Sequence, residues 1–537
     1  MEKRSNQKQT FLQGAAVLAL ATALVKLIGA VYKIPLQSVI GKAGYGYFGT
    51  AYSIYDVLLM ISTTGLPVAM SRMISEAQTL ERHDQIKKIF KVALRVFLAL
   101  GILGTAGMML GAHWLSEKIQ QNDKAWFSIF ALAPAVLLVS IIAAFRGFFQ
   151  GQSNMTPTSV SQVFEALCKL IFGLGFAWAL MNMTAGNETY GAGGAILGVT
   201  IGCAVSAVYL AVRYRKASKE LPAGGTTDSS RSILRTLLAI AVPITIGSAG
   251  LQIINLVDSA VYMKRLVGAA GVVSERADEL KGIYEFCRTI FNLPGAFITP
   301  LVISVIPAIT SHLTMKNNRG VRMVEGSALR ITGLIAMPCA LGLFSLSMPV
   351  VDLLSPASYT QTDLQVGGII LALMGITVIF NALILVTNAM MQAHGDVTTP
   401  VINMIIGGVV KVVINFFLVG IPELNIVGAA IGTLVCYFVI IVLNVAAMAK
   451  KKSIDLRSLK GLLKPLLASV LMGAVAYMVY GVLSARISAS ISTLAAIAAA
   501  GVVYLILVIL FRVITYDDCL LLPKGEKIAK ILRIRVD

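Results

Sequence analysis

Long hydrophobic runs separated by short polar connections recur along the whole of this chain. Each run holds about 20 residues, the length at which a helix crosses the hydrocarbon core of a bilayer. The longest connections hold only about 20 residues, which leaves no room for a soluble domain. The pattern predicts fourteen transmembrane helices, roughly at residues 11–34, 46–71, 89–112, 125–149, 157–181, 192–213, 233–262, 283–311, 327–354, 365–391, 398–420, 426–449, 461–483 and 489–514.

The composition supports this interpretation. Hydrophobic residues make up 57% of the 537 residues and charged residues only 13%, and the mean hydropathy is +0.81. A soluble fold of this size could not bury so much apolar surface. The first run follows Lys3, Arg4 and Lys8 as a signal peptide would, but it is too long and lacks a small-residue cleavage site. We therefore expect an all-α polytopic membrane protein that retains its first helix.

An internal repeat divides the chain. Ala93-Leu94-Arg95 recurs as Ala328-Leu329-Arg330, and Gly194-Ala195 recurs as Gly428-Ala429. Gln150, Thr156 and Lys169 likewise match Gln392, Thr398 and Lys411. The offset is always about 235–242 residues, so three ordered matches favour a duplicated unit.

The repeat predicts two parallel six-helix bundles, at residues 1–225 and 226–452. Residues 453–537 would add helices 13 and 14 and a basic cytoplasmic tail. The polar, Gly-rich linker near 217–231 is typical of a flexible hinge. Two such bundles could rock about a central cavity that opens to one membrane face at a time.

The net charge of +19 follows from topology. If the N-terminus is cytoplasmic, most Lys and Arg fall in inner loops, as the positive-inside rule requires. An even number of helices then places the C-terminus in the cytoplasm as well. Nucleic-acid binding need not be invoked, and the basic tail could contact anionic lipid heads.

Cations inside the apolar runs are the strongest sign of function. A charge at the centre of a lipid-facing helix costs about 2.5–3.5 kcal/mol, so such residues favour a partner charge, water or an anionic ligand. We interpret Lys26, Lys33 and Arg288 as ligands for an anion, and Arg95 and Arg330 as snorkelling to lipid heads. Glu165 and Lys169 have the spacing of a local salt bridge. The intramembrane cations are Lys26, Lys33, Arg95, Lys169, Arg288, Arg330 and Lys411.

A second group of residues could partner these cations or form a gate. Asp56, Asp258 and Glu285 are acids within the runs, and Glu285 shares a helix face with Arg288. Asn292 and Pro294 predict a broken helix, which membranes tolerate only where the freed backbone faces protein or water.

Motifs for enzymatic chemistry are missing from the sequence. It contains no P-loop, no paired histidines and no Cys-x-x-Cys, so we expect no enzyme activity, no metal and no cofactor. The six cysteines are typical of apolar packing residues. The glycine-rich run Gly41–Gly46 lies between two predicted helices and favours a tight hairpin.

The run Arg146-Gly147-Phe148-Phe149-Gln150-Gly151, followed by Pro157 and Ser161-Gln162-Val163, resembles the signature of the SpoVB/YtgP-type polysaccharide biosynthesis proteins. Gly65-Leu66-Pro67-Val68-Ala69 also matches. That family belongs to the multidrug/oligosaccharidyl-lipid/polysaccharide (MOP) exporter superfamily, which includes the MurJ-like lipid II flippases. The resemblance implies a fourteen-helix alternating-access fold in the bacterial plasma membrane, with cations of the first and eighth helices lining the cavity.

The resemblance also implies a substrate class. We expect a flippase that moves an undecaprenyl-diphosphate-linked cell-wall precursor, lipid II first among them, to the outer leaflet. Its partners would be this lipid-linked oligosaccharide, membrane lipids and enzymes of peptidoglycan or polysaccharide synthesis. The alternatives are an exporter of another lipid-linked unit (teichoic acid, capsule or spore cortex), a cation-coupled multidrug exporter, and a non-transporting scaffold or glycosyltransferase. The coupling ion, Na⁺ or H⁺, stays open.

Overall fold

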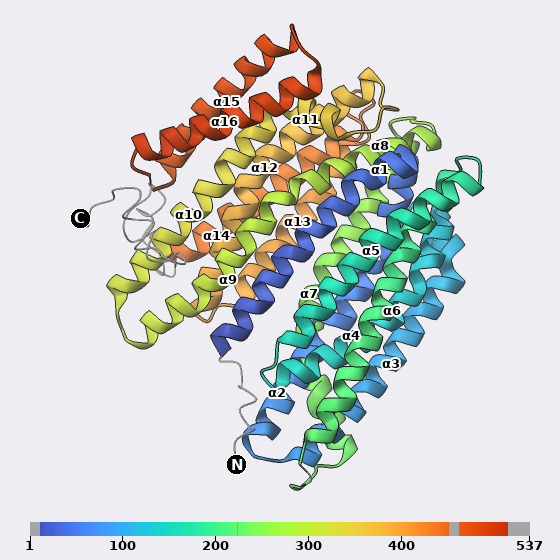
Figure 1. The fold of residues 1–537 in the computed structure, drawn as a ribbon, viewed down its shortest axis with the longest axis vertical. Helices are drawn as coiled ribbons and strands as arrows, with labels where there is room; N and C mark the ends of the chain where they lie inside the picture. Colours follow the sequence, from blue (N-terminus) through green and yellow to red (C-terminus); the bar gives the residue numbers. More distant parts are fainter. Residues whose placement is uncertain (1–10, 223, 451–460, 514–537) are drawn as a thin grey trace. The chain divides into compact units, whose positions relative to one another are not determined.

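The computed structural model describes residues 11–222, 224–450 and 461–513, and these ranges form helices and turns without a strand. Figure 1 shows the helices in chain order. They are α1 (Phe11–Thr63), α2 (Gly65–Thr79), α3 (His83–Trp114), η1 (Leu115–Ile119), η2 (Asp123–Ala125), α4 (Trp126–Gly151), α5 (Thr156–Met183), α6 (Glu188–Glu220), α7 (Ser230–Gly268), α8 (Ser274–Phe291), α9 (Leu293–Thr314), α10 (Asn318–Ser345), α11 (Ser347–Leu354), α12 (Gln361–Ala393), α13 (Thr398–Leu418), α14 (Val427–Lys450), α15 (Leu463–Ser484) and α16 (Ala489–Leu510).

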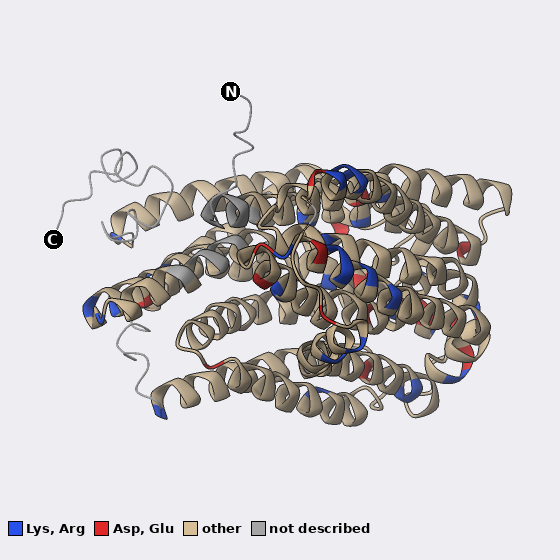
Figure 2. Ribbon diagram, turned by 90° about the horizontal axis from the view of Figure 1, so that it is seen from below, with Lys and Arg blue, Asp and Glu red and all other residues tan. Residues whose placement is uncertain are grey.

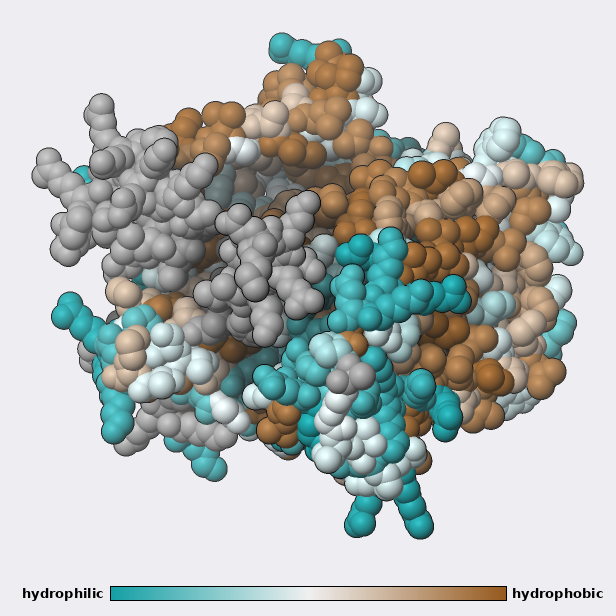
Figure 3. All heavy atoms as spheres, turned by 60° about the horizontal axis from the view of Figure 1, so that its bottom comes forward, coloured by the Kyte–Doolittle hydropathy of each residue, from teal (hydrophilic) through white to brown (hydrophobic). Residues whose placement is uncertain are grey.

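Twelve helical stretches within the described residues are long and apolar enough to cross a membrane. They confirm the all-α polytopic class, whereas the number fourteen stays a prediction. One stretch, Leu20–Thr79, covers two of the predicted helices. The predicted helix 283–311 is shared between α8 and α9. On the face drawn in Figure 3, hydrophobic residues cover broad areas and hydrophilic residues gather in patches between them.

The helices pack into two compact units. The first contains α1–α7 and α8 up to Gly282, and the second contains α8 from Ile283 onward together with α9–α16 and the short segment Gly268–Gly271. The packing boundary thus lies inside α8, because α7 packs in the first unit. The repeat-based bundles 1–225 and 226–452 rest on sequence similarity and stay a prediction.

A sharp kink divides α1 into two arms. Gly41 has φ 73° and ψ 179°, a left-handed backbone that favours glycine. The rings of Tyr32 and Phe48 lie 6.2 Å apart, whereas a straight helix would separate them by about 24 Å. The Glu188 carboxylate on α6 accepts a hydrogen bond from the Gly44 amide at 3.1 Å. The glycine-rich run therefore forms the predicted hairpin, and a carboxylate holds it.

A stripe of glycines brings α5 and α6 into backbone contact in the first unit. Added Cβ atoms on Gly194, Gly198 and Gly202 would overlap or crowd the α5 backbone at Phe176, Gly173 and Glu165. Small residues at four-residue spacing allow this approach, the usual basis of helix packing in membranes. In the second unit, Gly428 of α14 packs against the backbone at Leu418 of α13, and Gly432 packs against the side chain of Asn415.

The linker that was expected to be a flexible hinge is fastened to α3. Asp228 accepts from Arg82 Nη2 at 2.9 Å and from Gln85 Nε2 at 2.8 Å, and Lys87 Nζ donates to the Leu221 carbonyl at 3.2 Å. The basic start of α3 therefore overrides the flexibility that the Gly-rich composition predicts. The predicted basic tail lies outside the described residues.

Candidate anion site

Two lysines meet at one tyrosine ring in the first unit. The hairpin in α1 brings Lys33, on the first arm, over the ring of Tyr52 on the second, with Nζ 5.8 Å from the ring centroid. Lys169 Nζ, from the middle of α5, lies 4.7 Å from the same centroid. It also donates to the Tyr52 hydroxyl at 2.6 Å and lies 5.2 Å from the Tyr32 ring centroid. We call Lys33, Tyr52 and Lys169 the Tyr52 site.

The prediction of a salt bridge between Glu165 and Lys169 is wrong. Glu165 Oε2 lies 3.1 Å from Arg146 Nη2 on α4, and Arg146 Nε also donates to Ser161 Oγ at 3.0 Å. A guanidinium can satisfy two acceptors on one helix face, and it competes better than an ammonium for such a pair. Lys169 instead turns to the aromatic rings of α1.

The other signature residues form a packing joint. A Cβ on Gly147 would lie 2.5 Å from Met70 Cε and 3.1 Å from the Pro67 carbonyl oxygen of α2. Gly151 sits equally close to Ile74, and Gln150 lies in the last turn of α4. The two sequence runs that carry the family resemblance thus contact each other, and they position Arg146 against α5.

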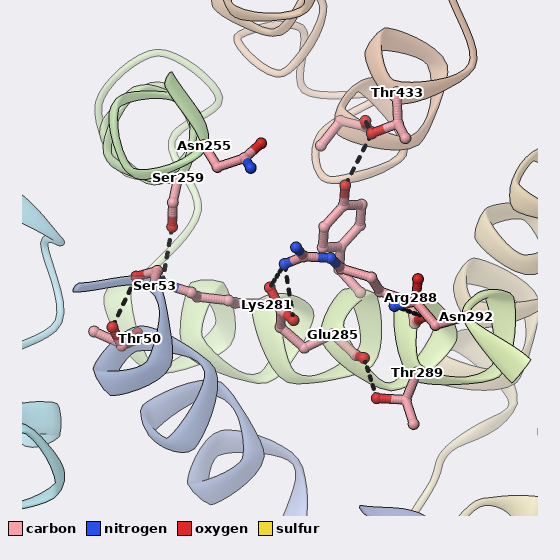
Figure 4. A network of polar contacts seen from close by, with 12 residues as sticks. Thr50, Ser53, Asn255, Ser259, Lys281, Glu285, Arg288, Thr289, Asn292 and Thr433 are labelled. Carbon is pink, nitrogen blue, oxygen red and sulfur yellow. Dashed lines mark hydrogen bonds and ion pairs between the residues drawn. The ribbon is translucent and has the colours of Figure 1, made fainter. Parts of the chain in front are cut away.

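Arg288 forms a local pair in the second unit. Its Nη1 lies 3.2 Å from Glu285 Oε1, and the Arg288 side chain is 47% exposed. Asn292 Nδ2 donates to the Arg288 carbonyl at 2.9 Å, between the end of α8 and the start of α9 (Figure 4). Pro294 follows in the first turn of α9. The chain therefore breaks where Asn292 and Pro294 predicted a break.

The remaining predicted residues are spread over the first unit. Lys26 is exposed on the first arm of α1, and Asp56 is half-buried on the second arm, four residues beyond Tyr52. Asp258 is buried on α7. Figure 2 shows how few charged residues interrupt the apolar helices. Among the described residues, no group of three or more His, Cys, Asp and Glu side chains could hold a metal ion.

The structure contains a fully buried lysine that the sequence did not predict. Lys281, in the middle of α8, donates to Gln120 Oε1 at 3.1 Å. It also donates to Ser259 Oγ at 3.3 Å (Figure 4). Its Nζ lies 5.9 Å from the Tyr262 ring centroid. Since Lys281 precedes the predicted helix 283–311, only its spacing of four residues before Glu285 could have indicated a place on the same helix face.

Burial raises the pKa of the Asp278 carboxyl to about 7, one turn before Lys281. The carboxylates of Asp123 and Glu188 raise it further, whereas Lys281 and Lys124 lower it. Asp278 lies outside the candidate membrane spans, and its side chain is buried with Oδ1 lacking a hydrogen-bond partner. Folding therefore favours the protonated carboxyl.

We expect the stability of the protein to fall as pH rises from about 4 to about 8. The folded pKa lies above the unfolded value of about 3.9, so ionisation favours unfolding, by on the order of 3 kcal/mol over this window. Asp278→Asn should remove most of this dependence and make the variant more stable than the wild type at pH 8. Thermal unfolding of the full chain in detergent at both pH values measures this.

The exposed Glu220, at the end of α6, supplies the matched control. Glu220→Gln should leave the pH dependence of the wild type intact. A wild-type protein whose stability stays level between pH 5 and pH 8 would contradict the raised pKa of Asp278.

These features define a multi-pass membrane protein with cations among its apolar helices. The family model described as "Polysaccharide biosynthesis protein" matches residues 11–312. Because the match covers more than half of the sequence, the chain belongs to the polysaccharide biosynthesis protein family, which confirms the resemblance seen in the sequence.

Curated relatives extend along nearly the whole chain. An uncharacterized membrane protein of Bacillus subtilis, YabM, is 27% identical over 97% of each chain. Stage V sporulation protein B of the same organism is 25% identical over 96% of this chain and 98% of its own. The lipid II flippase MurJ of Bacillus subtilis is 26% identical over 92% of this chain and 94% of its own.

Solved structures show the same fold. Lipid II flippase MurJ in an inward closed conformation matches with a TM-score of 0.69 and 16% identity, over 92% of this chain and 98% of its own. An inward-facing multidrug resistance MATE family transporter of the MOP superfamily matches with a TM-score of 0.65 and 16% identity, over 81% and 99%. The fold is therefore that of the MOP superfamily.

Proposed function

We propose that this protein is an alternating-access flippase for an undecaprenyl-diphosphate-linked cell-wall precursor, with lipid II as the first candidate. The observation that carries the proposal is the Tyr52 site, where two lysines converge inside an apolar unit. A charged side chain within the bilayer has an unfavourable free energy and usually marks a functional site. A bound diphosphate would offset that free energy. The kinship with MurJ and stage V sporulation protein B supports the same substrate class.

In this proposal Lys26, Lys33 and Arg288 bind the diphosphate. Glu285 holds Arg288 when no substrate is bound, since the two side chains lie 3.2 Å apart. Arrival of the diphosphate would exchange one partner for the other, which couples binding to a shift between states. Asp56 and Asp258 are further charge partners in the proposed cycle.

The helix break at Asn292 and Pro294 serves as the gate. A break frees backbone groups, and these are tolerated at membrane depth only where they face protein or water. We propose that the break lets α8 and α9 change direction as the cavity opens. The driving ion, Na⁺ or H⁺, is not assigned.

The protein would reside in the bacterial plasma membrane with both termini in the cytoplasm, as the distribution of Lys and Arg favours. The substrate would be collected at the inner leaflet from enzymes of peptidoglycan or polysaccharide synthesis. Its polyprenyl tail would stay in lipid throughout, because only the polar head needs a path across.

A depletion–rescue experiment tests the proposal. The protein is expressed in a bacterium depleted of its own lipid II flippase, and outer-leaflet lipid II is measured by its accessibility to an external cleaving toxin. We expect restored accessibility, with at least about a tenfold loss in Lys26→Ala and in Arg288→Ala. Each removes a charge-assisted contact to the diphosphate.

Lys219→Ala, at an exposed position in the last turn of α6, is the matched control and should rescue as the wild type does. Rescue by both Lys26→Ala and Arg288→Ala would reject the assigned residues. Failure of the well-expressed wild type would reject lipid II. Teichoic acid, capsule and spore cortex intermediates would then be tested by identifying which undecaprenyl-linked unit accumulates in the host that lacks the protein.

A further inference from the structure

We infer that Lys169 is a further substrate-binding residue, which together with Lys33 and the Tyr52 hydroxyl forms a three-donor subsite for the diphosphate. The inference rests on the proposed function and deepens it. The juxtaposition that carries it is two ammonium groups on one tyrosine ring, from helices more than 100 positions apart in the sequence.

The depth of Lys169 excludes snorkelling as its role. It stands near the middle of α5, with 13 residues of helix before it and 14 after it (169 − 156 and 183 − 169). At 1.5 Å per residue each end is about 20 Å away, far beyond the reach of a lysine side chain to a lipid head. Arg95 differs, since its side chain is exposed on α3, whereas that of Lys169 is half-buried.

The direct contacts of Lys169 are with neutral groups. Its closest oxygen is the neutral Tyr52 hydroxyl, and its other contacts are the faces of the Tyr32 and Tyr52 rings. Glu165, the acid one turn away, is occupied by Arg146. Within the part of the chain that the structure describes, no ion pair joins Lys169 to a carboxylate. Ring faces attract a cation but leave its net charge in place.

The arrangement is that of an anion site. Lys33 adds a second positive charge at the same ring, and like charges repel unless a negative group lies between them or beside them. Tyr52 accepts a hydrogen bond from Lys169 through its oxygen, so its own O–H proton is directed elsewhere. Two ammonium groups and one hydroxyl are donors suited to a phosphate, and a diphosphate has enough oxygens for all three.

Contacts with α5 and α6 fix the position of the Tyr32 ring beside Lys169. The Tyr32 ring can lie beside Lys169 only because Gly173 on α5 has no side chain, since a Cβ there would lie 2.8 Å from Tyr32 Cε2. The Tyr32 hydroxyl donates to the Ala195 carbonyl on α6 at 3.1 Å, which fixes the ring. One wall of the subsite is therefore set before any substrate arrives.

Binding to the purified full-length protein tests the inference. The protein is placed in nanodiscs of phosphatidylcholine, and its affinity is measured for undecaprenyl diphosphate and, in a second arm, for phosphatidylglycerol. We expect Lys169→Met to weaken undecaprenyl diphosphate binding by about tenfold or more. Lys169→Arg should lose about threefold or less, and Tyr52→Phe should fall between them. Arg95→Met is the matched control and should bind as the wild type does.

Stability separates a binding role from a structural one. A lysine kept for substrate binding costs stability, so Lys169→Met should unfold at a higher temperature than the wild type while it binds worse. A lower unfolding temperature with unchanged binding would overturn the inference. If Lys169→Met does not fold, Tyr52→Phe decides, because it removes only one hydroxyl.

The other outcomes of the binding experiment distinguish failure of the inference from failure of the proposed function. Wild-type binding of undecaprenyl diphosphate that Lys169→Met leaves unchanged overturns the inference and spares the proposed function. Loss of phosphatidylglycerol binding alone overturns it in favour of an ordinary lipid-head site. A wild type that binds no undecaprenyl diphosphate overturns the proposed function and the inference together.

Discussion

Gly198→Val is expected to destabilise the protein more than any other single change considered, by about 3 kcal/mol or more. A Cβ at this position would overlap the backbone N and Cα of Gly173 on α5. Backbone atoms cannot move aside as a flexible side chain can, so the two helices must separate. Separation also withdraws Gly173 from the Tyr32 ring, and with it the wall beside Lys169.

Gly175→Val is the matched control. Gly175 lies on the partner helix α5, two residues beyond Gly173, and a Cβ there would meet no atom within 4 Å. Heating the detergent-solubilised proteins and measuring the monodisperse fraction by size-exclusion chromatography compares the two variants. Equal loss in both would show that glycine content in α5 and α6, and not the close helix contact, determines stability.

Much of the fold can be predicted from the sequence because the bilayer simplifies the problem. Helices alone satisfy the backbone of a segment in lipid, apart from closed barrels, so hydrophobic runs give the fold class directly. The hairpin at Gly41–Gly46 follows from glycine chemistry, and the break at Asn292 follows from the nearby proline. The number of membrane-spanning helices stays a prediction, because a run such as Leu20–Thr79 forms one kinked stretch.

Packing determines what the sequence does not reveal. The boundary inside α8 depends on which helices α7 contacts, and no local pattern contains that information. The linker after α6 has a flexible composition, yet its Asp228 accepts a hydrogen bond from Arg82, which lies 146 positions earlier in the chain. Local propensity is a weak guide wherever a distant side chain supplies a better partner.

Some residues of the candidate site could be predicted from the sequence, and others could not. Lys33 and Arg288 could be found because each places a charge inside an apolar run. The Tyr52 site could not, because a tyrosine in an apolar helix has no distinctive pattern and its lysines lie on α1 and α5. Lys281 was missed because it stands just before the run in which charges were sought.

Two double-mutant cycles test whether Glu165 pairs with Arg146, as the structure shows, or with Lys169, as the sequence spacing indicates. A double-mutant cycle of Glu165→Gln with Arg146→Met should show a coupling of about 1–2 kcal/mol, because the two side chains are only 31% and 18% exposed. The cycle of Glu165→Gln with Lys169→Met should show a smaller coupling than the cycle with Arg146, because these two charges interact only through space. Lys169 contacts Tyr52 and not Glu165, so removing one should leave the other's contacts unchanged.

Free energies of unfolding from chemical denaturation in mixed micelles supply both cycles. A larger coupling to Lys169 than to Arg146 would restore the helical pair that the spacing of Glu165 and Lys169 indicates. It would also remove the reason for assigning Lys169 to the substrate, since a neutralised lysine offers a diphosphate no net charge. The expected result leaves Arg146 as the partner of Glu165, and Lys169 with Tyr52 and without a direct contact to Glu165.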